Sequence, residues 1–228
     1  MHALVYRGPG VKEWTEVPDP SLTDDTDAIV RVDAVTLCGT DLHILKGDVP
    51  AVTPGRILGH EAVGTVLATG SAVQSVAAGD RVLVSCITAC GACHYCRLQM
   101  HGQCLGGGGW ILGNTIDGTQ AEYVLVPDAQ ANLEPIPDGL SDEQVLMCPD
   151  IMSTGFKGQL GADVTLNFNQ CDVVAEVMKL TGGRGADSAI EALGTQGTFE
   201  SALRVLKPGG TLSSLGVYSS DLTIPMSA

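Results

Sequence analysis

Four cysteines within fifteen residues characterise the stretch that decides the fold, residues 90–104, whose sequence is CGACHYCRLQMHGQC. Two residues separate Cys90 from Cys93, two more separate Cys93 from Cys96, and Cys104 follows after another seven. Four thiolates on one short lobe match the tetrahedral preference of zinc and leave no open coordination position. The spacing therefore predicts a closed, structural zinc site.

The main alternative for this lobe is an iron–sulfur cluster, in which a two-and-two spacing also occurs. In such runs the fourth cysteine usually lies three residues on, before a proline, whereas Cys104 lies farther along and precedes Leu105. His94 and His101 flank the lobe and are candidate ligands of a variant site, although solvated loop histidines fit better beside four thiolates. Metal ligation also favours a reducing compartment over a secreted disulfide framework.

The composition excludes several kinds of partner. The 228 residues include 12 Lys and Arg and 26 Asp and Glu, which gives a formal charge of −14. Such a field repels phosphate backbones and anionic lipid, so neither nucleic acid nor a membrane surface is expected as a partner. The N-terminal residues lack a signal-peptide pattern, and no apolar run reaches the roughly 20 residues needed to span a bilayer. We expect a soluble, cytoplasmic protein.

Short β-strands separated by turns are predicted around the lobe. Apolar residues alternate with polar ones over 28–34, which is typical of a half-buried strand. Further strands are expected over 64–68, 81–84 and 122–126, each bounded by Gly, Asp or Pro. Many short strands with frequent turns favour a β-barrel-like domain, for which we predict the bounds 1–153.

The remaining part, 154–228, has a different pattern, in which helices alternate with strands. The predicted elements are a helix over 173–180, a strand over 187–191, a helix capped by Thr198 and ended by 207–210, and a strand over 211–217. Such alternation predicts a βαβ-type parallel sheet.

Two shorter stretches precede the lobe, LCGTDLH at 37–43 and GHEAVG at 59–64. Each is modest in isolation, because a lone Cys or His is more often a core residue than a ligand. Together with GDRV at 79–82, the lobe itself and PDIMSTGF at 149–156, they closely resemble the zinc-dependent alcohol dehydrogenases of the medium-chain dehydrogenase/reductase superfamily. The resemblance implies an α/β protein (α+β overall), with a GroES-like β-barrel zinc domain followed by a Rossmann-type parallel sheet.

The resemblance also implies a second, catalytic zinc. Cys38, His60 and Asp150 match its ligands, and Glu61 matches a neighbouring carboxylate that can join or leave the metal. Three ligands of mixed type leave a fourth position for water or substrate. Cys148 is a rival ligand on chemistry alone, but the residues after it put Asp150 in register.

Further residues match the proton relay and the substrate pocket of the family. Thr40 and His43 match the relay, in which Thr40 takes the proton of a zinc-bound alcohol and His43 passes it to solvent. In the family this relay runs through the cofactor ribose. Ile87 and Trp110 match positions that line the pocket, and Thr154 is the candidate contact to the cofactor. A partly buried loop aromatic is the structural alternative for Trp110.

The sequence departs from the family where the nicotinamide cofactor is bound. The family has a G-x-G-x-x-G turn after its first Rossmann strand, whereas here 157–159 leads straight into 160–164, which resembles a later stretch. Glycines two residues apart occur at 8/10, 106/108, 107/109 and 183/185, and none has a glycine three residues further on. Without that turn and its strands, we expect an incomplete Rossmann-type sheet with unpaired edges and an exposed apolar helix face. The family sheet also continues beyond the equivalent of Ala228.

Two functions follow from this pattern. The first is a zinc-dependent oxidoreductase that interconverts a small alcohol with an aldehyde or ketone, with two Zn²⁺ per chain and NAD(P) as the family cofactor. The second is a non-catalytic zinc-binding relic or truncated product that does not bind NAD(P). A homo-oligomer, as in the family, offers a third arrangement in which another chain supplies the missing turn.

Overall fold

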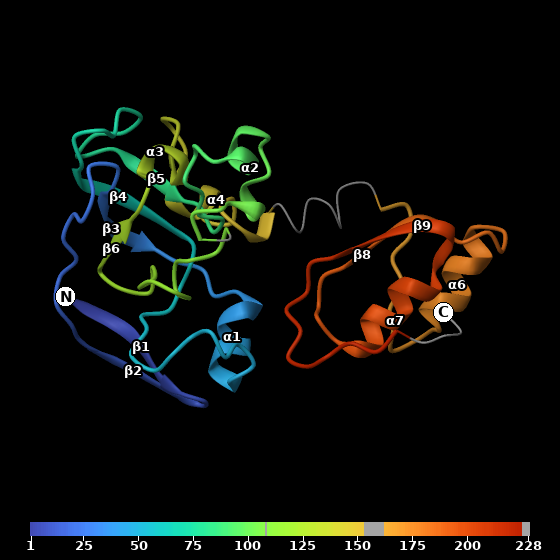
Figure 1. Ribbon diagram of the computed structural model, residues 1–228. Helices are drawn as coiled ribbons and strands as arrows, with labels where there is room; N and C mark the ends of the chain where they lie inside the picture. Colours follow the sequence, from blue (N-terminus) through green and yellow to red (C-terminus); the bar gives the residue numbers. More distant parts are fainter. Residues whose placement is uncertain (108, 153–161, 225–228) are drawn as a thin grey trace. The chain divides into compact units, whose positions relative to one another are not determined.

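The computed structural model describes residues 1–107, 109–152 and 162–224 (Figure 1). Contacts divide the chain into two compact units, Met1–Phe156 and Lys157–Ala228, each with its own sheet. The domain boundary predicted between residues 153 and 154 lies outside the described residues, as does Thr154.

A five-stranded sheet forms the centre of the first unit. Its strands, in the spatial order β6-β3-β4-β5-β7, are all antiparallel to their neighbours. Their bounds are β3 Ala28–Ala34, β4 Ala62–Thr69, β5 Arg81–Val84, β6 Tyr123–Val126 and β7 Leu133–Pro135. The four strands predicted from alternation and turns are thus confirmed, with small shifts at their ends.

A separate antiparallel hairpin precedes this sheet, formed by β1 (His2–Gly8) and β2 (Val11–Glu16). β1 joins the rest of the unit through isolated bridges from Ala3 to Ala121 and from Val5 to Ile57. Short helical segments connect the strands: α1 Gly39–Lys46, α2 His94–Arg97, η1 His101–Gln103, α3 Ala129–Asn132 and α4 Asp142–Val145.

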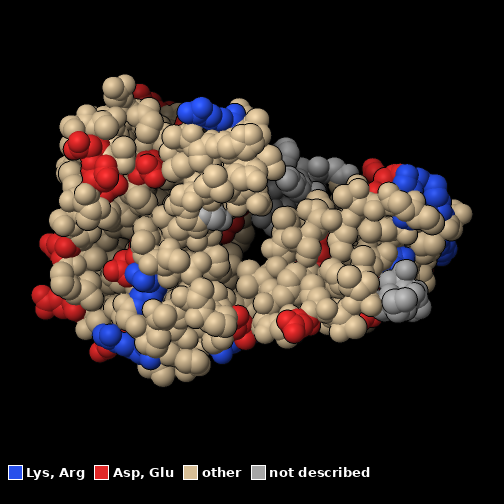
Figure 2. Space-filling model, in the orientation of Figure 1, with Lys and Arg blue, Asp and Glu red and all other residues tan. Residues whose placement is uncertain are grey.

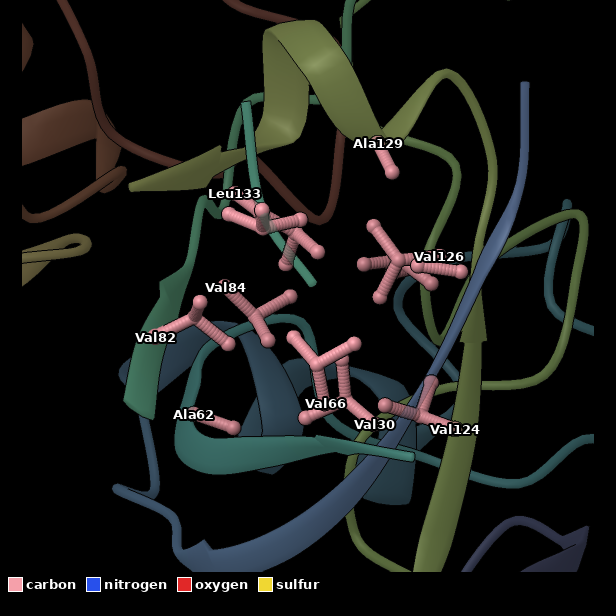
Figure 3. Packing of buried hydrophobic residues seen from close by; sticks show 12 residues of the cluster. Val30, Ala62, Val66, Val82, Val84, Val124, Val126, Ala129 and Leu133 are labelled. Atoms are coloured by element: carbon pink, nitrogen blue, oxygen red, sulfur yellow. The ribbon is translucent and has the colours of Figure 1, made fainter. Parts of the chain in front are cut away.

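Alternate residues of the sheet point into one apolar core, as a strand period of two requires. Val30 on β3, Val66 on β4 and Val124 on β6 are at most 2% exposed. Figure 3 shows their side chains converging with those of Val82 and Val84 from β5. This core fixes the start of β4, which His60 and Glu61 directly precede.

Within residues 162–224, the second unit contains a two-stranded parallel sheet with two helices, as expected for an incomplete Rossmann-type sheet. Its elements are α6 Val173–Leu180, β8 Ala186–Glu191, α7 Gln196–Arg204 and β9 Leu206–Ser214. In the described ranges β8 pairs only with β9, so its other edge has no strand partner there. The α/β fold class predicted from the sequence is confirmed.

Three predicted boundaries in this unit are wrong, one of them the end of the last strand, which lies at Ser214 and not at Val217. α7 begins two residues before the predicted cap, because the hydroxyl of Thr195 accepts the N–H of Thr198 and so makes Thr195 the N-cap. Leu206 and the turn residues 207–210, expected to end the helix, belong to β9. The strand register shifts there, between Ala186 and Ser188, so that the Pro-Gly-Gly turn is accommodated as an irregularity of the ladder.

The surface agrees with the acidic composition. Acidic side chains are spread over the face of the first unit in Figure 2, with basic ones between them. No helix within the described ranges is long and apolar enough to cross a bilayer.

Candidate metal centres

All four cysteines of the lobe are gathered around one point. The sulfur atoms of Cys90, Cys93, Cys96 and Cys104 lie within 4.8 Å of one another. Cys96 Sγ lies 3.4 Å from Cys93 Sγ and 4.0 Å from Cys90 Sγ. In a tetrahedral site with zinc–sulfur bonds of about 2.3 Å, neighbouring sulfurs are about 3.8 Å apart. All eight cysteines of the chain are free, so none of these sulfurs is tied up in a disulfide.

Backbone N–H groups favour the thiolate form at two of the four cysteines, Cys93 and Cys104, whereas burial raises the pKa of Cys96 to about 12. Cys104 Sγ accepts hydrogen bonds from the N–H groups of Cys90 and Gly106, each at 3.2 Å. The hydrogen bond from Cys90 is the main reason that the pKa of Cys104 is lowered. Hydrogen bonds from backbone N–H groups, that of Leu105 foremost, lower the pKa of Cys93 to about 6. The thiolate is the form that binds a metal.

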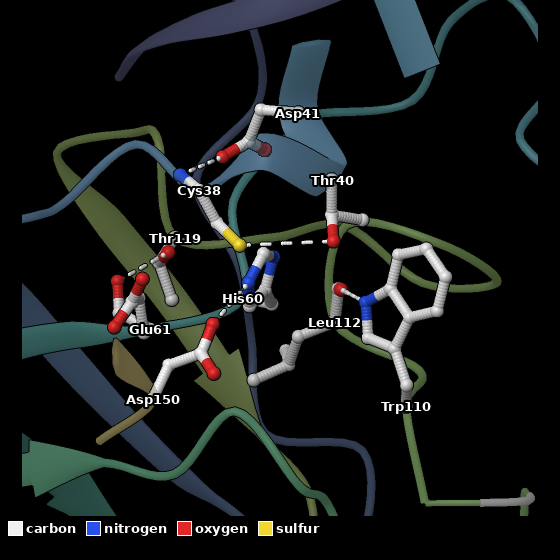
Figure 4. Close-up of polar contacts among 9 residues, drawn as sticks. All are labelled: Cys38, Thr40, Asp41, His60, Glu61, Trp110, Leu112, Thr119 and Asp150. Carbon is white, nitrogen blue, oxygen red and sulfur yellow. Dashed lines mark hydrogen bonds and ion pairs between the residues drawn. The ribbon is translucent and has the colours of Figure 1, made fainter. Parts of the chain in front are cut away.

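A second set of donors comes from three separate segments of the first unit. Cys38 is the N-cap of α1. His60 lies two residues before the first residue of β4, and Asp150 lies in the segment after α4. Their sulfur, imidazole nitrogen and carboxylate oxygen lie within 4.8 Å of one another (Figure 4). His60 Nε2 is 3.2 Å from Asp150 Oδ2, close to the roughly 3.3 Å between donors in a tetrahedral site with bonds of about 2.0 Å.

The electrostatics of this set favour a positive charge at its centre. Burial lowers the pKa of His60, but hydrogen bonds to Asp150 and Cys38 outweigh it and raise the pKa to about 10. The same contact with His60 lowers the pKa of Asp150. A protonated His60 ring or a divalent cation would each supply the positive charge that the Asp150 carboxylate favours here.

Glu61 lies beside this set and is only 1% exposed. Neither oxygen of its carboxylate has a hydrogen-bond partner within the described ranges, although both are buried. Burial raises the pKa of Glu61. A buried carboxylate without partners is costly unless a cation is near, so the residue fits a place next to a metal.

The relay candidates lie on α1. Thr40 Oγ1 is 3.7 Å from Cys38 Sγ, at the edge of the donor set. His43 is one turn further along the helix, and its Nδ1 lies 3.0 Å from Asp48 Oδ2.

The two pocket candidates differ in position. The Trp110 ring makes an edge contact with the His60 ring, with 6.1 Å between centroids, and its Nε1–H donates to the Leu112 carbonyl at 3.0 Å. Trp110 is thus a partly buried loop residue whose ring lies against His60 of the donor set. Ile87 follows β5 and is 39% exposed, so part of its side chain is free to contact a ligand.

The rival ligands lie outside both donor sets. Cys148 directs its sulfur at Met152 Sδ, 3.7 Å away. The His94 ring packs against Tyr95, with 5.3 Å between ring centroids. Neither residue, nor His101, belongs to a cluster of three or more candidate donors within the described ranges.

Sequence reasoning did not single out Asp41, which holds Cys38 in place. Its Oδ2 accepts the N–H of Cys38 at 2.9 Å, and the side chain is 3% exposed. The signal was present, because a carboxylate three residues after a helix N-cap is the second half of a capping box. Cys86 was also missed. Burial raises its pKa to about 12, so it remains a neutral thiol near Asp150 and Glu61.

Both donor sets fit zinc. The lobe offers four sulfurs and no open position, and the second set offers mixed sulfur, nitrogen and oxygen with an orphaned carboxylate beside it. A zinc-binding protein with an antiparallel sheet in its first unit and a parallel sheet in its second is the class that the fold and the two candidate donor sets define.

Comparisons with known proteins agree with this class. Residues 24–138 match the family described as "Alcohol dehydrogenase GroES-like domain", and residues 156–228 match "Zinc-binding dehydrogenase". An alcohol dehydrogenase of Cupriavidus necator is 50% identical over 100% of this chain and 80% of its own length. The chain belongs to the zinc-dependent alcohol dehydrogenase family of the medium-chain dehydrogenase/reductase superfamily, and is an oxidoreductase of that type.

Solved structures support the same conclusion. The apo form of zinc dependent alcohol dehydrogenase 2 from Streptococcus pneumonia has a TM-score of 0.89 at 33% identity, covering 100% of this chain and 79% of that one. An alcohol dehydrogenase from Thermus sp. ATN1 has a TM-score of 0.84 at 31% identity, covering 100% and 81%.

The cofactor of the family, NAD(P), does not fit the described residues. The Cupriavidus necator alignment spans 293 positions, 65 more than the 228 residues of this chain, so about 65 positions of it hold no residue of this chain. Gly183-Arg184-Gly185 connects α6 to β8, as expected, and a Cβ on Gly185 would lie 2.7 Å from the backbone nitrogen of Lys207. That turn packs against β9 and is not the open, phosphate-binding turn before a helix that NAD(P) needs.

Proposed function

We propose that this chain carries the zinc-holding, alcohol-binding half of the alcohol dehydrogenase reaction, in which an alcohol and NAD(P)⁺ give an aldehyde or ketone and NAD(P)H. One observation carries the proposal: the donor atoms of Cys38, His60 and Asp150 lie within 4.8 Å of one another. Three donors leave a fourth position for the oxygen of a small alcohol, aldehyde or ketone. The four-cysteine lobe takes the second of two zinc ions.

The residues around this position suit alcohol activation. Zinc, when bound there, polarises an alcohol oxygen and lowers the pKa of its hydroxyl. Thr40 lies 3.7 Å from Cys38 Sγ and accepts the alcohol proton while it gives up its own. Thr40 and His43 are three residues apart on α1 and therefore neighbours on one helix face, so His43 is placed to pass the proton to solvent. Trp110 and Ile87 supply apolar walls.

The other half of the reaction is the acceptance of hydride, which needs a group other than zinc. Zinc cannot accept hydride, which in this family passes to the nicotinamide. The described residues do not form the turn that holds this cofactor. We therefore expect the chain alone to bind zinc and an alcohol oxygen with little or no turnover.

A second candidate function is a non-catalytic zinc protein, a relic or truncated product of an alcohol dehydrogenase. The 65 alignment positions without a residue of this chain favour it. An oligomer in which another chain supplies the missing turn is a third arrangement, and it predicts cofactor binding that depends on protein concentration. The eight free cysteines support a reducing, cytoplasmic location for any of the three.

A zinc count combined with a cofactor titration tests the proposal. We expect two zinc ions per chain and no change in fluorescence on titration with NADH or NADPH. Asp150→Asn should reduce the count to one, whereas Asp138→Asn, at an exposed loop position, should leave two. Micromolar binding of NADH or NADPH would instead establish a complete enzyme, and a single zinc in the unmutated chain would overturn the catalytic site.

A further inference from the structure

We propose that Asp48 is a positioning residue that fixes which ring nitrogen of His43 receives a relayed proton. His43 Nδ1 lies 3.0 Å from Asp48 Oδ2, and the two side chains are only 21% and 25% exposed. Another histidine–carboxylate pair of this chain, His2 with Glu122, is 3.7 Å apart and about half exposed at both side chains. The contact of Asp48 with His43 is therefore the shorter and better shielded of the two.

The contact is built into the end of α1. Gly47 ends the helix in the left-handed conformation, with φ 86°, and its N–H donates to the Ile44 carbonyl at 2.9 Å. The N–H of Asp48 donates to the His43 carbonyl at 3.0 Å, so the chain folds back by one turn and brings the Asp48 carboxylate within hydrogen-bond distance of the ring nitrogen Nδ1.

Gly47 cannot easily be replaced at this turn. A side chain there would be strained by the positive φ, and its Cβ would lie 2.9 Å from Pro9 Cγ. The turn that delivers Asp48 to His43 is therefore held both by its backbone conformation and by packing against the segment that precedes β2.

The chemical consequence concerns the tautomer of the neutral imidazole. A carboxylate can only accept a hydrogen bond, so Asp48 keeps the ring hydrogen on Nδ1 and leaves the lone pair on Nε2. Nε2 is then the nitrogen that is open to a relayed proton, and the same nitrogen later releases a proton to water. The Asp48 carboxylate faces the imidazolium that exists between these two transfers and offsets its charge. This role rests on the relay of the proposed function, whereas the tautomer itself does not.

Nitrogen NMR of the His43 ring tests the assignment, because the two ring nitrogens give different signals when they carry or lack hydrogen. In the full chain, purified with zinc and kept above the pH at which imidazole is protonated, we expect a hydrogen-bearing Nδ1 and a bare Nε2. Asp48→Ala should lose this pattern in favour of the Nε2–H form. Glu122→Ala, which removes the carboxylate from His2, should leave the His43 signals unchanged.

The outcomes separate the two proposals. A bare Nδ1 in the unmutated chain, or a pattern that Asp48→Ala leaves intact, overturns the role of Asp48, and the first result needs no variant to fold. An unchanged zinc count in Asp48→Ala shows that the donor set survives, because Asp48 does not belong to it. If the tautomer is as expected but no zinc binds at Cys38, His60 and Asp150, the proposed function fails and the orientation of His43 stands.

Discussion

The two units of this chain differ in where they keep their apolar side chains. In Met1–Phe156, residues such as Val66 and Leu112 are at most 1% exposed. In Lys157–Ala228, Phe199 is the single buried hydrophobic residue of the described range, whereas Ile190 and Leu215 are about half exposed.

The difference follows from how each sheet is completed. The antiparallel sheet of the first unit has five strands, some paired across long stretches of sequence such as β3 with β6, and together they enclose one core. Parallel strands need helices on both faces and strands on both sides, and β8 has one strand neighbour in the described range. All the candidate zinc donors lie in the first unit, which is the unit with the larger buried core.

Among the variants that test this difference between the units, we expect the largest effect from a substitution in the four-cysteine lobe of the first unit. Cys96 is 5% exposed and its sulfur lies within 4.0 Å of two others. Structural zinc sites in small domains contribute about 10–16 kcal/mol of apparent binding free energy. Cys96→Ser should therefore abolish one of two bound zinc ions, measured by a metal count, and expose residues 90–104 to proteolysis.

Cys171→Ser is the matched control, because Cys171 lies in the second unit and its sulfur contacts only the Asn167 carbonyl, at 3.4 Å, among the described hydrogen bonds. This variant should keep both zinc ions and leave residues 90–104 resistant to proteolysis. Two zinc ions retained by Cys96→Ser would show that the lobe is not a metal site.

A pair of leucine truncations sharpens the comparison of the two cores. Leu112→Ala removes a side chain that is 0% exposed in the first unit, and Leu215→Ala removes one that is 51% exposed in the second. The first should lower the free energy of unfolding by about 2–5 kcal/mol, as buried truncations do. The second should change it by about 0.5 kcal/mol or less, as surface substitutions do.

Urea unfolding, followed separately in each unit by amide hydrogen exchange, measures both effects. Equal losses for the two variants would mean that Leu215 is covered in solution, for instance by a second copy of the chain.

The sequence was most informative where spacing or alternation encodes one chemistry. The four cysteines and the strand over 28–34 are such cases, because metal ligands and buried faces repeat at short, fixed intervals. Only the family resemblance implied that Cys38, His60 and Asp150 belong together, and the structure brings them together although they are up to 112 residues apart in the chain.

Prediction from the sequence failed where an element or contact leaves no periodic pattern of apolar residues in the sequence. All residues of β2 are exposed or half-buried, so no alternation marks it as a strand. Thr195 and Thr198 are both good caps, and only the direction of their hydrogen bond decides where α7 begins. The contact between Asp48 and His43 depends on the left-handed turn at Gly47, which sequence reasoning did not consider.

The smallest effect concerns Glu191, which is the best-satisfied buried group of the second unit. The residue ends β8 and is 3% exposed. Its Oε1 accepts the N–H groups of Leu193 and Gly194 and the hydroxyl of Thr198, all at 2.8 Å, and its Oε2 accepts the hydroxyl of Tyr218. One carboxylate thus ties together β8, the start of α7 and the segment after β9.

The pH dependence of this unit should follow from that carboxylate. Burial raises the pKa of Glu191, but hydrogen bonds, first that from Tyr218, outweigh it and hold the pKa below its ordinary value of 4.5. Because the pKa of Glu191 is lower in the folded than in the unfolded chain, its stabilisation of the fold is complete above about pH 4.5 and is lost as the pH falls through the folded pKa.

Glu191→Gln should lower the free energy of unfolding at neutral pH by about 1.5–3 kcal/mol, the contribution of hydrogen bonds to a charged group. The control Glu176→Gln, on a helix without buried residues, should leave the stability at neutral pH unchanged. Carboxyl NMR of Glu191 and hydrogen exchange in β8 measure both, and an acid-insensitive β8 would show that packing rather than this carboxylate holds the partial sheet.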